Sequence, residues 1–164
     1  MNRTATRLST AALALAASCL AVGAAGVPSA VAAPRATAVA AAGCEANDAH
    51  AAADAYLAAL VSHDASAVPF APDVRRVENG LVTGRSGEEI RKDLNTSIKY
   101  KIISGLHDRV YTEDPPAPDG GVSLHVNYVL DIGAPDFTLL KAKVAERFDV
   151  RCGQITFIEA SISL

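Results

Sequence analysis

The stretch from Asp73 to Leu94 constrains the fold most, because it changes from a strand pattern to a helix pattern across three glycines. Its first part, Asp73 to Asn79, contains two β-branched valines and predicts a short strand. The glycines follow at positions 80, 84 and 87. Glycine reaches positive φ without steric cost, so these positions predict turns.

A helix is predicted to begin just after Ser86, which is a good N-cap residue. Glu89 lies three residues further on and completes a capping box. Glu88 and Glu89 also place negative charge in the first turn, where the helix dipole favours it. Ile90 and Leu94 are four residues apart and start an inward apolar stripe.

The remaining segments predict helices first and a sheet afterwards. A helical pattern runs from Cys44 or Glu45 to Ser62 and is rich in alanine, so this helix can approach a sheet closely. Asp64 is expected to cap a short turn after it. An antiparallel meander is then predicted from strands at 98–106, with a bend or bulge at Gly105, continued or paired by 107–112, then 122–132, 140–150 and 154–163. This order predicts an α+β fold, with helices on the concave face of a curved sheet and a pocket between them.

Two of these strands alternate clearly. In 140–150 the alternation places Glu146 on the apolar face. An unpaired buried carboxylate is costly, so Glu146 must be protonated, paired or in a wet pocket. In 122–132 the sequence leaves open which face points inward: Tyr128 lines the pocket in one case, and His125, Asn127 and Asp131 line it in the other.

The N-terminus has the pattern of a secretory signal peptide. Arg3 and Arg7 precede an apolar run that is short for a membrane span, and Ala30-Val31-Ala32 fits a cleavage site. We therefore expect a signal peptide at 1–32, a flexible leader at 33–43, a domain at 44–164, and a secreted, extracytoplasmic protein that has no membrane attachment after cleavage. Ala38-Val39-Ala40 is a second possible cleavage site.

Charge and cysteine content narrow the function further. Removing residues 1–32 removes two arginines and no acids, so the net charge changes from −3 to −5. A nucleic-acid partner is therefore not expected, since such binding depends on basic patches. In an exported chain Cys44 and Cys152 are expected to form a disulfide, which would contribute on the order of 4–5 kcal/mol.

Metal, cofactor and nucleophile motifs are missing from the sequence. The four histidines have no metal-ligand spacing, so no metal is expected. No serine lies in a nucleophile elbow, and no cofactor is expected.

Several motifs resemble the nuclear-transport-factor-2-like superfamily, which includes ketosteroid isomerases and SnoaL-like polyketide cyclases. The resemblance covers the mature domain and is carried by 56–64, 73–79, 84–91 and 153–160. The runs 63–72 and 77–80 are most similar to an uncharacterised secreted branch of this superfamily. The resemblance implies a cone-shaped roll with a pocket at its wide end.

In isomerases of this type a tyrosine on the first helix and an acid on a late strand donate to an oxyanion, and an acid on the first strand shuttles the proton. The resemblance assigns these roles to Tyr56, Glu146 and Glu78. Both acids are glutamates where the isomerases carry aspartate, and Asn79 replaces a proline. Asn79, Tyr128, His125 and Asp131 are further ligand-binding candidates.

Two function classes follow. The first is a secreted protein that binds a small apolar or polyketide-like molecule without converting it. The second is an isomerase or cyclase with Glu78 as general acid/base, its pKa raised by burial, and Tyr56 and Glu146 as oxyanion donors. A different interpretation of Glu78 is a strand-end acid paired with Arg75, Arg76 or Arg85. A third interpretation is an interaction domain that forms a homodimer through the outer face of its sheet, which is charged.

Overall fold

The computed structural model describes residues 48–134 and 136–164. The predicted signal peptide, the leader and Cys44 lie outside these residues. The elements are α1 (Ala49–Ser62), β1 (Phe70–Glu78), β2 (Leu81–Gly84), α2 (Gly87–Thr96), α3 (Ile98–Lys101), β3 (Ile103–Glu113), β4 (Val122–Ala134), β5 (Phe137–Arg151) and β6 (Gln154–Ser163).

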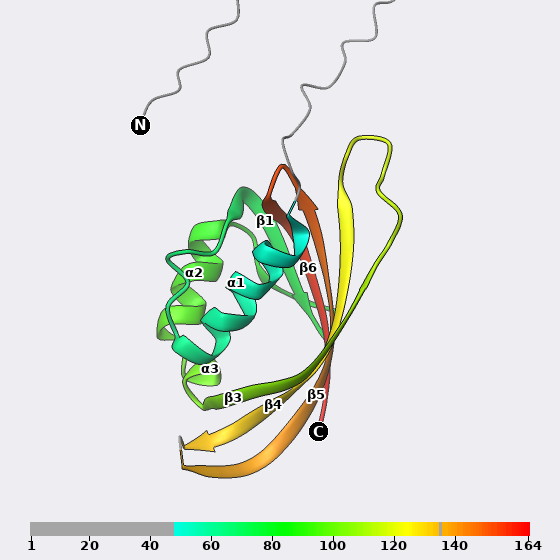
Figure 1. Cartoon of the computed structure of the whole chain (residues 1–164). Coiled ribbons are helices and arrows are strands. Elements are labelled where there is room, and N and C mark those ends of the chain that lie inside the picture. The colour runs from blue at the N-terminus through cyan, green and yellow to red at the C-terminus, as the bar shows by residue number, and fades with distance from the viewer. Residues whose placement is uncertain (1–47, 135) are drawn as a thin grey trace, which may run out of the picture. The chain divides into compact units, whose positions relative to one another are not determined.

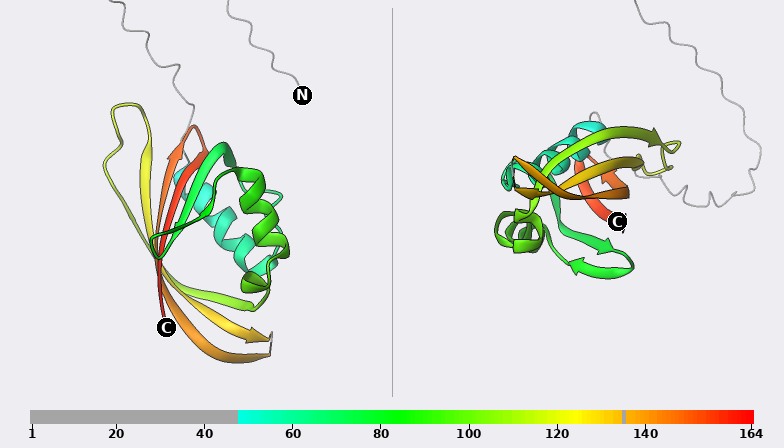
Figure 2. Two further views of the ribbon diagram at one scale, coloured as in Figure 1. Left: turned by 180° about the vertical axis from the view of Figure 1, so that it is seen from behind. Right: turned by 90° about the horizontal axis from the view of Figure 1, so that it is seen from below.

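The strands form one curved, unclosed sheet in the order β2-β1-β6-β5-β4-β3. The contact of β1 with β6 is parallel. The other pairs are antiparallel, so the predicted meander from β3 to β6 is confirmed. The helices lie together against one side of the sheet, as the two side views show (Figures 1 and 2). The predicted α+β roll is therefore confirmed.

Helix α1 begins at Ala49, four or five residues later than the sequence predicts. The Asp48 side chain is its N-cap and accepts a hydrogen bond from the Ala51 N–H at 2.8 Å. The helix ends where His63 adopts a left-handed conformation, with φ of 58°. The turn expected at Asp64 is present, since its carboxylate accepts from the Ser66 N–H at 2.9 Å.

Helix α2 is capped by Ser86, whose hydroxyl accepts from the Glu89 N–H at 3.1 Å. The predicted reciprocal contact is displaced by one residue: the Glu89 carboxylate accepts from the Arg85 N–H, at 2.8 Å, rather than from the Ser86 N–H. The Ser86 half of the predicted capping box is thus confirmed. The Glu89 side chain instead binds the backbone N–H of Arg85, the residue before the cap.

The three glycines of the central stretch serve two different purposes. Gly80 has φ of 79° and forms the turn between β1 and β2, as predicted. The chain breaks between Gly84, where β2 ends, and Gly87, where α2 begins, as predicted. Neither glycine has positive φ, so the reason predicted for them is wrong. A Cβ on Gly84 would lie 2.4 Å from Ile90 Cγ1, and one on Gly87 would lie 2.8 Å from Phe70 Cβ. Close packing of α2 against β1 and β2 explains both, and β2 itself was not predicted.

Gly84→Ala is expected to lower the free energy of unfolding by about 1–3 kcal/mol, because the new methyl group overpacks the core at Ile90. Urea unfolding measures this loss. Gly121→Ala is the matched control: Gly121 has no positive φ, and its Cβ would meet only Asp119 Oδ1 at 3.2 Å and Val150 O at 3.8 Å. Equal stability of Gly84→Ala and the wild type would contradict the packing explanation.

The strand predicted at 98–106 is partly wrong. Residues 98–101 form the single turn of α3, and β3 begins at Ile103. Ile98 and Tyr100 would share one face of a strand, yet Tyr100 is buried and Ile98 is largely exposed, which does not fit a strand. The irregularity expected at Gly105 is confirmed as a register shift between β3 and β4.

Strands β4 and β5 settle the question of which face points inward. The even-numbered residues of β4 from Val122 to Leu130 are buried. In β5 the buried residues are Ala142, Val144, Glu146, Phe148 and Val150, which confirms the predicted alternation. Tyr128 and Glu146 therefore share the face that the helices cover.

Candidate functional site

A cavity of about 160 Å³ lies between the helices and the inner face of the sheet. Tyr56, Glu78 and Glu146 all line it, together with Tyr128 and Tyr100. Most of the other lining residues are aliphatic side chains of β3, β4, β5 and β6. The cavity thus combines a few polar side chains with walls that are otherwise apolar.

Tyr56 reaches the cavity from α1, and its side chain is 1% exposed. Its ring packs edge-on against Phe70 and Phe148, with centroids 6.1 and 5.3 Å away. Burial raises the pKa of the hydroxyl, and the nearby charge of Glu146 raises it further, while the Arg76 guanidinium opposes them. The hydroxyl is therefore a neutral hydrogen-bonding group.

Glu146 is buried, with 4% exposure, on the inner face of β5. The Tyr128 hydroxyl donates to its Oε2 at 2.7 Å. Burial raises the pKa of this carboxyl from 4.5 to about 8; the Tyr128 hydrogen bond lowers it, and the charge of Glu78 raises it. Glu146 is thus protonated at neutral pH and has an O–H that can donate a hydrogen bond.

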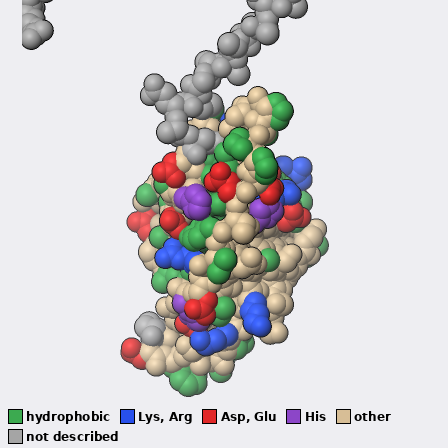
Figure 3. All heavy atoms as spheres, turned by 45° about the vertical axis from the view of Figure 1, so that its right-hand side comes forward, with side chains coloured by type: hydrophobic (Ala, Val, Ile, Leu, Met, Phe, Trp, Pro, Cys, Tyr) green, Lys and Arg blue, Asp and Glu red, His purple; other side chains and the backbone are tan. Residues whose placement is uncertain are grey.

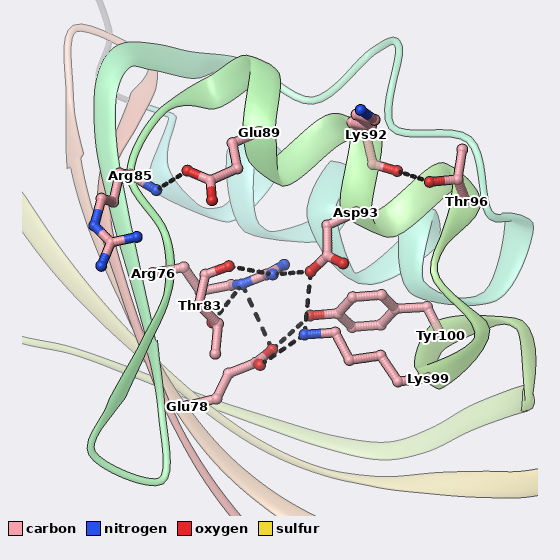
Figure 4. Close-up of polar contacts among 10 residues, drawn as sticks. All are labelled: Arg76, Glu78, Thr83, Arg85, Glu89, Lys92, Asp93, Thr96, Lys99 and Tyr100. Atoms are coloured by element: carbon pink, nitrogen blue, oxygen red, sulfur yellow. Dashed lines mark hydrogen bonds and ion pairs between the residues drawn. The ribbon is translucent and has the colours of Figure 1, made fainter.

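Glu78, at the end of β1, is held by three partners (Figure 4). The Tyr100 hydroxyl donates to Oε1 at 2.5 Å, Lys99 Nζ donates to Oε2 at 3.2 Å, and Arg76 Nε lies 3.5 Å from Oε1. Burial acts to raise the pKa of Glu78, but Arg76, Tyr100 and Lys99 together outweigh it and the pKa is lowered. This is opposite to the raised pKa predicted for a general base. Pairing with Arg76, the other interpretation, is what the structure shows.

Arg76 is fully buried and connects Glu78 to α2. It donates from Nε to Thr83 Oγ1 at 3.0 Å, from Nη2 to Thr83 O at 3.2 Å, and from Nη2 to Asp93. Lys99 Nζ also lies 3.1 Å from Asp93 Oδ2. Two cations and two carboxylates therefore form one compensated cluster (Figure 4), of which Glu78 and Lys99 line the cavity. We call Arg76, Glu78, Asp93 and Lys99 the four-charge cluster.

Sequence reasoning named Arg76 only as one of three alternative partners of Glu78, and it missed Asp93 and Lys99. For Arg76 a signal was present, since it lies two residues after Val74 and two before Glu78, on one face of a strand. For Asp93 and Lys99 no comparable signal exists, because their roles depend on how α2 and α3 fold back onto β1.

Two of the four further ligand-binding candidates lie on the opposite sheet face and do not line the cavity. His125 Nε2 lies 3.1 Å from Asp114 Oδ2, and Asp131 Oδ1 lies 3.4 Å from Lys141 Nζ. Figure 3 shows histidine side chains beside carboxylates on the surface of the molecule. The alternation of β4 gives the reason, since its odd-numbered residues face away from the helices.

Asn79 also does not line the cavity. Its Oδ1 accepts from the Ile162 N–H at 2.7 Å, and its Nδ2 donates to Ile162 O at 3.3 Å. The amide thus extends the parallel pairing of β1 with β6 by one side chain. Tyr128 is therefore the one of these four candidates that lies at the cavity.

Among residues 48–134 and 136–164, no three His, Cys, Asp or Glu side chains are arranged to hold a metal ion. Within the same residues, no helix is both long and apolar enough to cross a membrane.

Cys152 lies in the turn between β5 and β6, with φ of 51°. Its disulfide to Cys44 remains a prediction, because Cys44 is outside the described residues.

Residues 45–162 match the model of a family described as Domain of unknown function (DUF8021). No curated protein matches the chain.

Solved structures share the fold at low sequence identity. A protein from Kribbella flavida DSM 17836 is 16% identical over 69% of this chain and 84% of its own, with a TM-score of 0.52. Mtr2 of Candida albicans is 9% identical over 69% and 92%, with a TM-score of 0.51. The canthaxanthin-binding Orange Carotenoid Protein of Anabaena (Nostoc) sp. PCC 7120 is 17% identical over 70% of this chain but 35% of its own, with a TM-score of 0.51. These likenesses support a nuclear-transport-factor-2-like fold and no particular activity.

Proposed function

Because the chain belongs to the family described as Domain of unknown function (DUF8021), which names no activity, we propose a function from the site itself. The protein binds a small, neutral, mainly apolar molecule that carries one hydrogen-bond acceptor, and the predicted export places this binding outside the cytoplasm. The observation that supports it is an apolar cavity whose polar residues include a buried carboxyl, Glu146, whose pKa is raised by that burial.

The cavity volume sets the size of the ligand. About 160 Å³ is close to the size of engineered apolar cavities of about 150 Å³ that bind benzene. Sites for drug-sized ligands are larger, roughly 300–1,000 Å³. The sequence suggested a small apolar or polyketide-like molecule. A single apolar ring, the first of these, fits this volume better than a larger polyketide-like ligand.

The polar groups set the ligand's chemistry. Both oxygens of Glu78 already have partners, Tyr100 and Lys99. Glu146 uses one oxygen to accept from Tyr128, which leaves its other oxygen for a ligand. The Tyr56 hydroxyl lies near the Arg76 guanidinium, and its own proton can be donated to a ligand. Two neutral O–H groups match a carbonyl oxygen, and the cation that lines the cavity, Lys99, is already paired with Glu78 and Asp93. The Anabaena neighbour binds canthaxanthin, which supports ligand binding as one use of this fold.

The alternative, an isomerase or cyclase, needs Glu78 as a general acid/base. A useful base has a pKa near the working pH, whereas Arg76, Tyr100 and Lys99 lower the pKa of Glu78. Glu146 and Tyr56 would suit the oxyanion-donor roles of that alternative, but the proton shuttle is too weakly basic. Binding without conversion is therefore the function that we propose.

Tyr56→Phe is expected to weaken the binding of cyclohexanone about tenfold, because one hydrogen bond to the carbonyl is lost. NMR titration of the protein with cyclohexanone gives the dissociation constant. Benzene is the control ligand, since it fills the same volume and accepts no conventional hydrogen bond, and its affinity should not change.

The affinity for cyclohexanone should also fall as the pH rises above about 8, since Glu146 then loses the proton that it donates. If cyclohexanone does not bind to the wild type, the proposed function is wrong. Equal losses for cyclohexanone and benzene in Tyr56→Phe would show a packing defect and contradict the donor role.

A further inference from the structure

Among residues 48–134 and 136–164, Lys99 is the side chain that lines both the cavity and a neighbouring surface groove. On one side it lines the cavity of about 160 Å³, where its Nζ contacts Glu78. On the other side it lines a surface groove of about 360 Å³ between β2 and α2. The residues of that groove are Thr83, Glu89, Lys92, Asp93, Thr96 and Lys99, and they appear together in Figure 4. Of the residues that line either space, Lys99 alone belongs to both.

The contacts of Lys99 are divided between the two spaces. Its Nζ lies 3.2 Å from Glu78 Oε2, on the cavity side, and 3.1 Å from Asp93 Oδ2, on the groove side. The ammonium also lies 4.7 Å from the centre of the Tyr100 ring. The side chain is nevertheless 44% exposed, which places it at the boundary between the interior and solvent.

Losing the contact with Glu78 does not leave that carboxylate unpaired. Arg76 lies within 3.5 Å of Glu78 and also donates to Asp93, and the Tyr100 hydroxyl still donates to Glu78. Lys99 can therefore leave Glu78 while it keeps Asp93, at the cost of one partly exposed ion pair. Such a partly exposed pair is weak, and thermal motion breaks it readily.

The local backbone supports this mobility. Lys99 is on α3, a single turn of four residues. Its N-cap residue, Ser97, makes no side-chain capping hydrogen bond. Tyr100, the next residue, is buried and anchors the turn, so the Lys99 side chain can move while α3 stays in place.

We propose that Lys99 controls entry to the cavity: its ammonium closes the passage from the groove when it contacts Glu78 and opens it when it contacts Asp93 alone. Lys99 also sets the charge selectivity of the entrance, because a positive group at the passage repels cationic molecules and admits neutral ones. This rests on the proposed function in one respect, since the cavity must be a place that molecules enter.

Xenon exchange tests the entry role without requiring a hydrogen bond to the ligand. Apolar cavities of about this size take up xenon. Lys99→Met keeps a long apolar side chain and removes the charge, so the rate of xenon exchange measured by NMR should rise about fivefold, as expected for loss of one weak ion pair. Lys101→Met is the matched control, since Lys101 lies on the same helix, is exposed, and lines neither the cavity nor the groove. Its exchange rate should equal that of the wild type.

Equal exchange rates in Lys99→Met and the wild type would overturn the proposal, as would an equal increase in Lys101→Met. No xenon uptake in either protein would overturn it too, because the entrance would then lead to no accessible cavity. Cyclohexanone separates this proposal from the binding function. Xenon exchange that depends on Lys99, without cyclohexanone binding, supports entry control and rejects the proposed ligand class. Cyclohexanone binding with unchanged xenon exchange supports the proposed ligand class and rejects entry control.

Urea unfolding of Lys99→Met tests whether general destabilisation of the domain causes the faster xenon exchange. A variant whose unfolding midpoint matches that of Lys101→Met but whose xenon exchange is faster supports entry control. If exchange is faster but the unfolding midpoint of Lys99→Met is clearly below that of Lys101→Met, general destabilisation explains the exchange, and entry control is contradicted.

Discussion

Glu146→Gln is expected to be more stable than the wild type at pH 9, by about 3–5 kcal/mol, and equally stable near pH 4.5. Burial raises the pKa of Glu146 from 4.5 to about 8, so the folded state holds a proton that the unfolded state has released between these two pH values. Wild-type stability therefore falls as the pH rises through this window, by roughly 1.4 kcal/mol per pH unit. A glutamine has no charge to bury, and its amide oxygen can still accept from the Tyr128 hydroxyl.

Urea unfolding at a series of pH values from 4.5 to 9 measures this difference. Glu88→Gln is the matched control, because Glu88 is exposed in the first turn of α2. Its difference from the wild type should stay within about 0.5 kcal/mol. A Glu146→Gln difference that does not change with pH would contradict a neutral Glu146.

Arg76→Met is expected to lower the free energy of unfolding by about 3–5 kcal/mol at pH 7, because it leaves two carboxylates without their buried partner. Arg76 is fully buried, with contacts to Glu78, Asp93 and Thr83. The pKa of Glu78 should also rise toward its ordinary range, since Arg76 is the largest of the groups that lower it. Urea unfolding and carboxyl NMR measure the two effects.

Arg75→Met provides the control, since Arg75 is the exposed neighbour of Arg76 on the same strand. The double variant Arg76→Met/Asp93→Asn should lose less stability than the sum of its single changes, because each removes a charge that the other compensates. A loss below about 1 kcal/mol for Arg76→Met would mean that the four-charge cluster does not stabilise the fold.

Much of the fold follows from periodicity in the sequence. The alternation in β5 places Glu146 inward because a strand sends successive side chains to opposite faces. The N-cap at Ser86 is equally local, since its hydrogen bond to Glu89 lies within four residues. Such features were predictable because their causes lie close together in the chain.

The features that escaped prediction have distant causes. Residues 98–101 form a helical turn in which Tyr100 and Lys99 reach Glu78, more than twenty residues earlier in the chain. Gly84 is required by the approach of Ile90, which only the packing of α2 reveals. The inward face of β4 depends on where the helices lie.

The charge states of Glu78 and Glu146 also could not be predicted from the local sequence. Both were candidates from the sequence, and burial was expected to raise the pKa of Glu78. Burial outweighs the other effects on the pKa of Glu146, whereas Arg76, Tyr100 and Lys99 outweigh burial for Glu78. The balance between desolvation and ion pairing depends on distances between side chains of different elements, which no local pattern contains.

A carboxyl NMR titration of Glu146 and Glu78, with and without cyclohexanone, tests the central claim most directly. The claim is that one cavity holds a neutral carboxyl for its ligand beside an ionised one fixed by Arg76. We expect the pKa of Glu146 to be near 8 and to shift upward with cyclohexanone, while the pKa of Glu78 is lowered by Arg76 and does not respond. A Glu146 that titrates near 4.5 and does not respond to cyclohexanone would contradict the account.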